Sequence, residues 1–394
     1  MSDKAREPFK IEEDFFKSSF IKKIEIYFYK FLFLIFKRLP VNKKKITIIS
    51  FHHDYLYGNN KAITKQLLLQ KPEYDLKFVF KKDTSFDNVF SIKKLITKIR
   101  MSYLYNTSKY IILDDFYGLL SEVKFKKNIE IIQVWHGTGV FKKFGATRHN
   151  ITPELIDRLE KVGKQYSVVL ASCDEIVPLL SKSFLVEKDK IKAIGSPKSD
   201  IFFDKNYIAD TKEKFFDENL ELIGKKIIVY APTYRDYDRN KDISLDINKM
   251  YDELFKLGYI VVLKLHHLER GNITHLTQKY HGFVYDFSTR DIDDIMIVAD
   301  ILITDYSSLI FEYSVLQKPL IFYAYDLELY SGDTRGFYYP YEEFAPAPIV
   351  QTTDETISLI KQDKWDKESL KRFSDRFIAN QGFASKYFVD GMIA

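Results

Sequence analysis

The sequence predicts an α/β protein in which two Rossmann-like domains, each built on a parallel sheet, face a cleft and follow a basic amphipathic helix. The length of 394 residues indicates two domains, since one domain takes roughly 100–200 residues. From Ile46 onward, short β-rich runs alternate with helical or loop stretches, as in parallel sheets. Several runs are almost continuously apolar, which is expected of strands covered by helices on both faces.

The N-terminal helix is predicted over residues 20–40, FIKKIEIYFYKFLFLIFKRLP, whose apolar residues recur at helical spacing. The longest uncharged run is 31–36, far short of the about 20 residues of a spanning helix, and no signal-peptide cleavage site follows. The pattern predicts a peripheral helix on an anionic membrane surface; the alternative is a helix packed on the protein body with solvated lysines. The residues expected at the membrane are Phe28 and Phe31, with a stripe of Lys23, Lys30 and Lys37 spaced by seven.

The body divides into two sets of expected strands. The first set is 46–51, 76–80, 110–115, 130–136, 167–172 and 191–196. The second set is 226–233, 259–266, 283–288, 300–306 and 319–326. The predicted domains are therefore the N-terminal helix, 1–45, and two Rossmann-like domains, 46–215 and 216–394.

Composition excludes several classes of protein. Hydrophobic residues make up 46% and charged residues 29%, which fits neither a polytopic membrane protein nor a mainly disordered chain. The net charge of +5 is concentrated in residues 17–45, which hold nine basic residues and one acidic residue. No nucleic-acid partner is expected, because the rest of the chain is slightly acidic. A single cysteine, Cys173, allows no intrachain disulfide and fits a cytoplasmic location.

Chemistry is expected just after the strands, where parallel sheets bind their ligands. His136 leaves its strand into a turn with Gly137, Thr138 and Gly139. An imidazole there can take a proton near neutral pH, and the backbone N–H groups of the turn can face an anion. The alternative is a tight turn whose histidine is structural.

Two further strand ends carry candidate residues. Ser196 and Pro197 close the first half of the chain, and Thr233 and Arg235 open the second. A guanidinium offers bidentate hydrogen bonds to phosphate. The alternative for Arg235 is a surface ion pair with a neighbouring aspartate.

Residues 264–267, Lys-Leu-His-His, end the next strand, and alternation places Lys264 and His266 on one face. We expect His266 to face the cleft and stabilise phosphate charge. A metal site and a buried core histidine are the alternatives; no partner carboxylate has ligand spacing.

The segment 299–323 combines a strand with the start of a helix. Asp305 ends the strand, Ser307 and Ser308 stand at the helix start, and Glu312 lies one turn further. Serines and free N–H groups at a helix start can hold phosphate, and Glu312 could accept hydrogen bonds from ribose. The alternative is a capped helix with a surface glutamate. The sequence contains no P-loop, dinucleotide fingerprint or nucleophile elbow.

In this order, the motifs resemble the CDP-glycerol glycerophosphotransferase family, which includes the teichoic-acid primases and polymerases. The resemblance covers about residues 46–390 and departs from the family pattern at Gly139, Tyr234, His267 and Ala347. The segments that carry it are YGNNKAI (57–63), QVWHGTGVFKKFG (133–145), GSPKSD (195–200), YAPTYR (230–235), KLHH (264–267), LITDYSSLIFEYSVLQKPLIFYAYDLELY (302–330) and RGFYYPYEEFAPAPIV (335–350).

The resemblance implies a GT-B-like fold and metal-independent transfer of glycerol phosphate from CDP-glycerol, releasing CMP, with no cofactor. Domain 46–215 would lie on the acceptor side, and domain 216–394 would bind the CDP donor. His136 would be the general base, and His266 and Arg235 would neutralise the transferring phosphate. The acceptor would be an undecaprenyl-diphosphate-linked molecule at the cytoplasmic face of the membrane. The residues expected to bind the donor are Gly137, Thr138, Ser196, Pro197, Thr233, Asp305, Ser307, Ser308 and Glu312.

Other functions stay open. The chain could use CDP-ribitol or build a capsule polymer with a polyol phosphate. It could be a GT-B glycosyltransferase that uses a nucleotide sugar, or a non-catalytic membrane scaffold. Its size favours a primase-like enzyme that adds one or few units, and homo-oligomer formation is left open.

Overall fold

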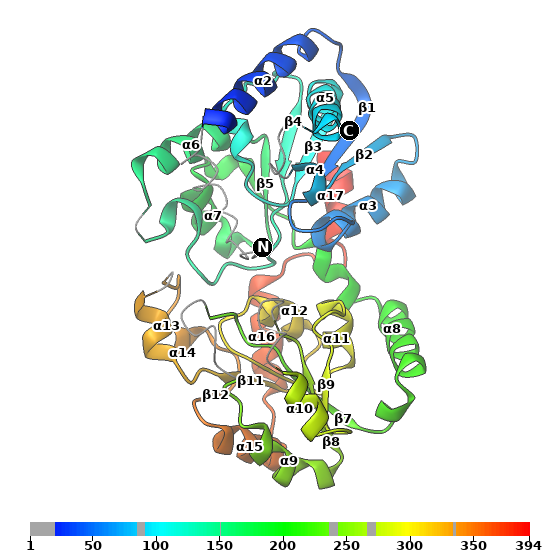
Figure 1. Ribbon diagram of the computed structural model, residues 1–394, viewed down its shortest axis with the longest axis vertical. Helices are drawn as coiled ribbons and strands as arrows, with labels where there is room; N and C mark the ends of the chain where they lie inside the picture. Colours follow the sequence, from blue (N-terminus) through cyan, green and yellow to red (C-terminus); the bar gives the residue numbers. More distant parts are fainter. Residues whose placement is uncertain (1–19, 85–90, 150, 236–242, 266–272, 334–335) are drawn as a thin grey trace. The chain divides into compact units, whose positions relative to one another are not determined.

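The computed structural model describes residues 20–84, 91–149, 151–235, 243–265, 273–333 and 336–394, with only the backbone for 20–25 and 331–333. The chain forms two compact units (Figure 1). The first unit takes in the chain up to Asp200 together with Phe377–Ala394, and the second is Ile201–Arg376.

The sheet of the first unit has six parallel strands in the order β2-β1-β3-β4-β5-β6. Its strands are β1 (Asn42–Ile49), β2 (Asp75–Val79), β3 (Ser108–Leu113), β4 (Glu130–Gln133), β5 (Val168–Ala171) and β6 (Ile191–Ala193). Its helices are α2 (Phe20–Phe36), α3 (Gly58–Gln70), α4 (Lys81–Thr84), α5 (Ile92–Thr107), α6 (Pro153–Gly163), α7 (Val177–Phe184) and α17 (Ala384–Met392).

One face of this sheet is covered by helices from opposite ends of the chain. Ile46, Ile48 and Ile112 of the strands pack in one buried cluster with residues of α3 and α17. The C-terminal helix α17 therefore lies beside α3 in the first unit (Figure 1). The contact is apolar, since Phe388 and Val389 are fully buried in the cluster.

The second unit repeats the architecture with the strand order β12-β11-β10-β7-β8-β9, all parallel. Its strands are β7 (Lys226–Tyr230), β8 (Tyr259–Leu263), β9 (Val284–Asp286), β10 (Ile301–Thr304), β11 (Leu320–Tyr323) and β12 (Ile349–Val350). Its helices are α8 (Lys205–Glu218), α9 (Ile247–Leu254), α10 (Thr274–Lys279), α11 (Ile292–Val298), α12 (Leu309–Val315), α13 (Leu327–Asp333), α14 (Tyr341–Phe344), α15 (Thr353–Gln362) and α16 (Lys367–Phe377).

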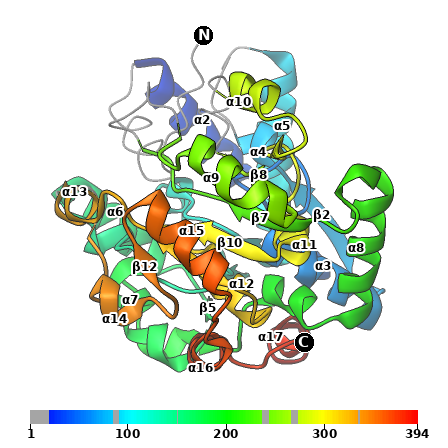
Figure 2. The same cartoon turned by 90° about the horizontal axis from the view of Figure 1, so that it is seen from below.

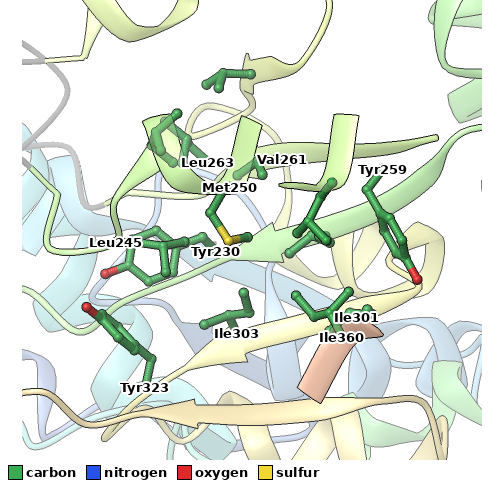
Figure 3. Close-up of a cluster of buried hydrophobic side chains, with 14 of the residues drawn as sticks. Tyr230, Leu245, Met250, Tyr259, Val261, Leu263, Ile301, Ile303, Tyr323 and Ile360 are labelled. Carbon is green, nitrogen blue, oxygen red and sulfur yellow. The ribbon is translucent and has the colours of Figure 1, made fainter. Parts of the chain in front are cut away.

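Alternate residues of the second sheet point to a core beneath α9 and α15, which lie side by side (Figure 2). Tyr230, Val261 and Ile303 come from three neighbouring strands, and Met250 and Ile360 come from the two helices (Figure 3). Period-two alternation along each strand brings these side chains to one face.

The structure confirms the α/β class and the two parallel sheets. It divides the chain differently from the predicted boundary at 215/216, because α8 belongs to the second unit and residues 377–394 return to the first. Strand β12 has two residues and was not anticipated. No helix among the described residues combines the length and apolarity that crossing a bilayer requires.

Candidate active site

In the first sheet the strand order reverses between β1 and β3, the place where open α/β sheets bind ligands. His52 follows β1 and Asp115 follows β3, while His136 follows the next strand, β4. Because all these strands are parallel, their carboxyl ends meet at one edge of the sheet. The three side chains therefore gather there.

Asp115 lies between the two histidines. Its Oδ2 atom is 2.7 Å from His52 Nε2 and 4.0 Å from His136 Nδ1. The histidine rings meet edge to face, with centroids 4.8 Å apart. Asp115 is buried and its Oδ1 accepts a hydrogen bond from the N–H of Phe116 at 2.6 Å. This arrangement places Nδ1 of His136 on the side of the carboxylate.

The charges around this edge set the protonation states. Partial burial of the ring lowers the pKa of His136 to about 4, although Asp115 raises it. His136 is 41% exposed, so a neutral imidazole is accessible at neutral pH. Burial also lowers the pKa of His52, but Asp115 and the nearby Asp114 outweigh it and raise the pKa above its ordinary value. Burial raises the pKa of Asp114 to about 6.

His52, Asp115 and His136 offer ligand atoms within 4.8 Å of one another, as a metal site would. However, ligand atoms around a tetrahedral metal lie roughly 3.3 Å apart, given bonds of about 2 Å. The 2.7 Å approach of His52 to Asp115 is instead the distance of a direct ion pair. The three groups are thus paired with one another, and the absence of a metal stays a prediction.

The turn that carries His136 is strained and tightly bonded. Trp135 has a φ of 56°, a left-handed conformation that a tryptophan rarely adopts. Its N–H donates to Gln133 Oε1 at 2.9 Å, and its ring stacks on Phe144 at 4.6 Å between centroids. The turn is therefore held in one conformation by its surroundings.

The residues predicted to bind the donor in the first unit are mostly internal. Thr138 and Ser196 are buried and share a hydrogen bond of 2.9 Å between their hydroxyl groups. Pro197 is buried and Gly137 is half-buried. The hollow behind them measures about 10 Å³, about the room of one water molecule. The two hydroxyl groups bond to each other and so join the turns that carry them. Donor binding by Thr138 and Ser196 stays a prediction, and it would involve their backbone.

The second sheet reverses its strand order between β7 and β10, where Arg235 and Asp305 lie. Arg235 is only 5% exposed, and its Nη2 atom is 2.7 Å from Asp305 Oδ2. Its Nε donates to Asp326 Oδ2 at 2.7 Å, and Nη1 donates to the carbonyl of Thr233. Burial opposes the charge of Arg235, but Asp305 and Asp326 outweigh it and raise its pKa.

Arg235 is therefore a buried ion pair rather than an open phosphate fork in this conformation. The aspartates nearest in sequence, Asp236 and Asp238, lie outside the described residues, so a surface ion pair with them is not tested. Asp305 also accepts hydrogen bonds from the N–H groups of Thr233 (2.8 Å) and Tyr306 (2.6 Å). It thus joins two strand ends, and a direct contact of Asp305 with the donor stays a prediction.

The two serines at the start of α12, both predicted to bind the donor, differ in exposure. Ser308 is exposed and its side chain does not cap the helix. Ser307 is half-buried and its hydroxyl accepts the N–H of Leu309 at 3.3 Å. Glu312 is only 1% exposed, so the alternative of a surface glutamate is wrong.

Some predicted residues cannot be placed. His266 and His267 lie outside the described residues. Lys264 is described, and its Nζ donates to the carbonyls of Ser288 (2.9 Å) and Arg290 (2.5 Å). The side chain of Lys23 is likewise outside the description.

Helix α2 packs on the body through one face and exposes another. Lys30 Nζ is 2.5 Å from Glu122 Oε2, and Lys37 Nζ donates to the carbonyl of Lys124 at 2.8 Å. Phe28 is half-buried and Phe31 is 59% exposed. The two lysines therefore contact the protein body, and the exposed face over residues 26–36 is apolar. It consists of Tyr27, Phe31, Leu34 and Ile35.

Comparison with known proteins agrees with this architecture. The chain is 35% identical over 380 residues to the teichoic acid poly(ribitol-phosphate) polymerase of Bacillus spizizenii, covering 95% of this chain and 60% of that protein. It is 31% identical over 373 residues to the teichoic acid glycerol-phosphate primase of Bacillus subtilis, covering 91% and 93%. The structure of the wall teichoic acid polymerase TagF superposes with a TM-score of 0.75 at 25% identity, covering 94% of each chain.

The two parallel-sheet Rossmann-like units and their strand-end site define a protein of GT-B-like fold. Residues 31–391 match the family described as CDP-Glycerol:Poly(glycerophosphate) glycerophosphotransferase. The chain belongs to that family.

Sequence reasoning missed His52, Asp114 and Asp115. The signal was present, because His52 directly follows the predicted strand 46–51 and both aspartates end the strand 110–115. Applying the strand-end rule to every strand would have found them.

Proposed function

We propose that the chain transfers a polyol phosphate from a CDP-linked polyol to an acceptor hydroxyl and releases CMP, with His136 as general base. The observation that carries the proposal is the accessible His136 imidazole, neutral at neutral pH, with Nδ1 toward Asp115. A general base must be unprotonated and must have one ring nitrogen free for the substrate.

The reaction balances without a further reagent. The acceptor oxygen attacks the β-phosphorus of the donor, the new P–O bond forms, and the bond to the CMP oxygen breaks. The acceptor proton passes to Nε2 of His136. Asp115 stabilises the imidazolium that results, because its carboxylate lies 4.0 Å from Nδ1. His266 and the exposed Ser308 stay proposed phosphate contacts.

The sequence motifs favour glycerol phosphate as the transferred group, with CDP-glycerol as its donor. The proposed reaction is primase-like and adds one or few units. Ribitol phosphate is the second candidate, since identity to the ribitol-phosphate polymerase is 35% and to the glycerol-phosphate primase 31%. The proposed acceptor is a hydroxyl on an undecaprenyl-diphosphate-linked carrier at the cytoplasmic face of the membrane.

The exposed apolar face of α2 supports docking on an anionic membrane. Helix α5 lies beside α2, where Phe36 of α2 meets Tyr103 of α5 with ring centroids 5.9 Å apart. Ile92, 77% exposed, and Ile96 are further apolar residues on α5, and Lys93 beside them is exposed. Apolar residues with flanking basic groups are typical of helices that bind membrane interfaces.

CMP release with CDP-glycerol, CDP-ribitol and a UDP-sugar tests the donor, using a prenyl-diphosphate disaccharide acceptor bearing one glycerol phosphate. We expect EDTA-resistant CMP release with one of the two CDP-polyols, and product length reports the number of units added. Release of UDP from the sugar nucleotide would instead identify a glycosyltransferase. Donor binding without any turnover would favour a scaffold.

A further inference from the structure

Asn59 lies in the first turn of α3, between two turns that come from different strands. Its Nδ2 group donates to the carbonyls of Val134 and Trp135, each at 2.9 Å. Its Oδ1 accepts from the N–H of Lys198 at 2.9 Å and from the Ser196 hydroxyl at 3.4 Å. Asn59 is buried, so the carboxamide makes these bonds away from solvent.

The two carbonyls that Asn59 binds directly precede His136. One of them belongs to Trp135, whose left-handed backbone persists only if its surroundings enforce it. Donors to both carbonyls fix the two peptide planes from which the His136 backbone continues. The orientation of the imidazole therefore depends on Asn59, although Asn59 does not touch it.

The bonding pattern also explains why this residue is an asparagine. A carboxamide supplies two donors and an acceptor on one planar group. An ionised aspartate has the same shape but only acceptors, so it would face two carbonyl oxygens without a hydrogen. A serine is smaller and has a single donor.

The next residue, Asn60, uses its carboxamide in the same way to bind the other side of the site. Asn60 is fully buried, and its Nδ2 donates to the carbonyl of Ile49 at 3.0 Å and to Asp114 Oδ2 at 3.2 Å. The start of α3 thus binds the strand ends that carry His52, Asp115 and His136.

We propose that Asn59 is the positioning residue of the general base, holding the turn of His136 against the turn at Ser196 through one buried carboxamide. The proposal rests on the proposed role of His136. It assigns the Asn59 side chain to orientation of the base.

The test is Asn59→Asp, with Asn59→Ser as a second variant that introduces no charge. We expect kcat of CMP release to fall by up to about 100-fold, because small misplacements of a catalytic group have large effects. In N59D, KM for the CDP-polyol should stay within about two-fold of the wild type, since the new carboxylate can still accept the N–H of Lys198 and hold the turn at Ser196. In N59D, kcat should recover in part at lower pH, where the new carboxyl is protonated and can donate once.

The matched control is Asn106→Asp. Asn106 is buried in the same unit, and its side chain donates to the carbonyl of Ser102 within its own helix at 2.9 Å. The N106D substitution makes the same chemical change as N59D, at a buried site that does not contact the His136 turn. N106D should keep the wild-type kcat in the fraction that remains folded.

A second readout separates this proposal from the proposed reaction. Histidine NMR titration follows His136 directly, without turnover. We expect the His136 resonance to move toward an ordinary histidine titration in N59D and to stay in place in N106D. Wild-type protein without CMP release would overturn the proposed function alone. Unchanged kcat and unchanged His136 titration in both Asn59 variants would overturn the positioning role.

Discussion

Asp115 is shared by His52 and His136, and its charge is the stabilising partner of a protonated His136. Asp115→Asn keeps the shape and removes the charge, so the pKa of His136 should fall further below about 4 and the base should weaken. We expect kcat to fall by about 10–100-fold, with the acid limb of its pH profile at lower pH. A pH series of initial CMP-release rates measures both effects. Asp217→Asn, at an exposed aspartate of α8, is the control, and an unchanged profile in D115N would contradict the role of the carboxylate.

For Arg235 we predict an effect on stability, because the side chain is buried between Asp305 and Asp326. Arg235→Ala leaves two buried carboxylates without their cation, which should reduce the free energy of unfolding by about 3–5 kcal/mol. Denaturant unfolding measures this loss. Arg372→Ala, at an exposed arginine of α16, should change stability little. An R235A protein of wild-type stability that fails to bind the donor would favour the phosphate contact instead.

At the scale of the element, α2 separates into a buried face and an exposed one. Tyr29 and Phe33 are buried, and Phe33 meets Phe125 with centroids 5.0 Å apart. Deleting residues 1–40 would therefore uncover part of the core as well as remove the apolar face. Replacing Phe31 and Leu34 by serine changes the apolar face without uncovering the core, because both side chains are exposed.

The double substitution should weaken binding to anionic liposomes and leave turnover of a soluble acceptor analogue intact. Co-sedimentation with liposomes measures binding. Leu220 and Ile223 in the second unit are also exposed, and replacing both by serine gives a control with equal loss of apolar surface. Equal binding by both doubles would contradict membrane docking through α2.

Individual strands show how much of the fold the sequence could predict. Alternation and apolar runs locate strands such as 226–233 and 259–266 because burial on both faces leaves a local signature. The observed strands end earlier, at Tyr230 and Leu263. The inward turn of Arg235 was not predictable, because its partner Asp326 is 91 residues away and no local pattern joins them.

At the scale of the whole molecule, the C-terminal helix α17 returns to the core of the first unit. Phe388 is fully buried in the cluster with β1, β3 and α3, although it lies near the C-terminus. Phe388→Ala should reduce the free energy of unfolding by about 3–5 kcal/mol through loss of buried area and a cavity. Phe383→Ala, at an exposed phenylalanine just before the helix, should have little effect. Equal stability of both variants in denaturant unfolding would mean that α17 does not belong to the core of the first unit.

The most direct measurement of the central claim is CMP release by His136→Asn beside His281→Asn, which changes an exposed histidine of the second unit. With the CDP-polyol that the wild type uses, H136N should lose about 100-fold or more in kcat while donor binding by calorimetry persists. H281N should match the wild type. Wild-type turnover by H136N, at equal protein and donor concentration, would contradict His136 as the base that activates the acceptor.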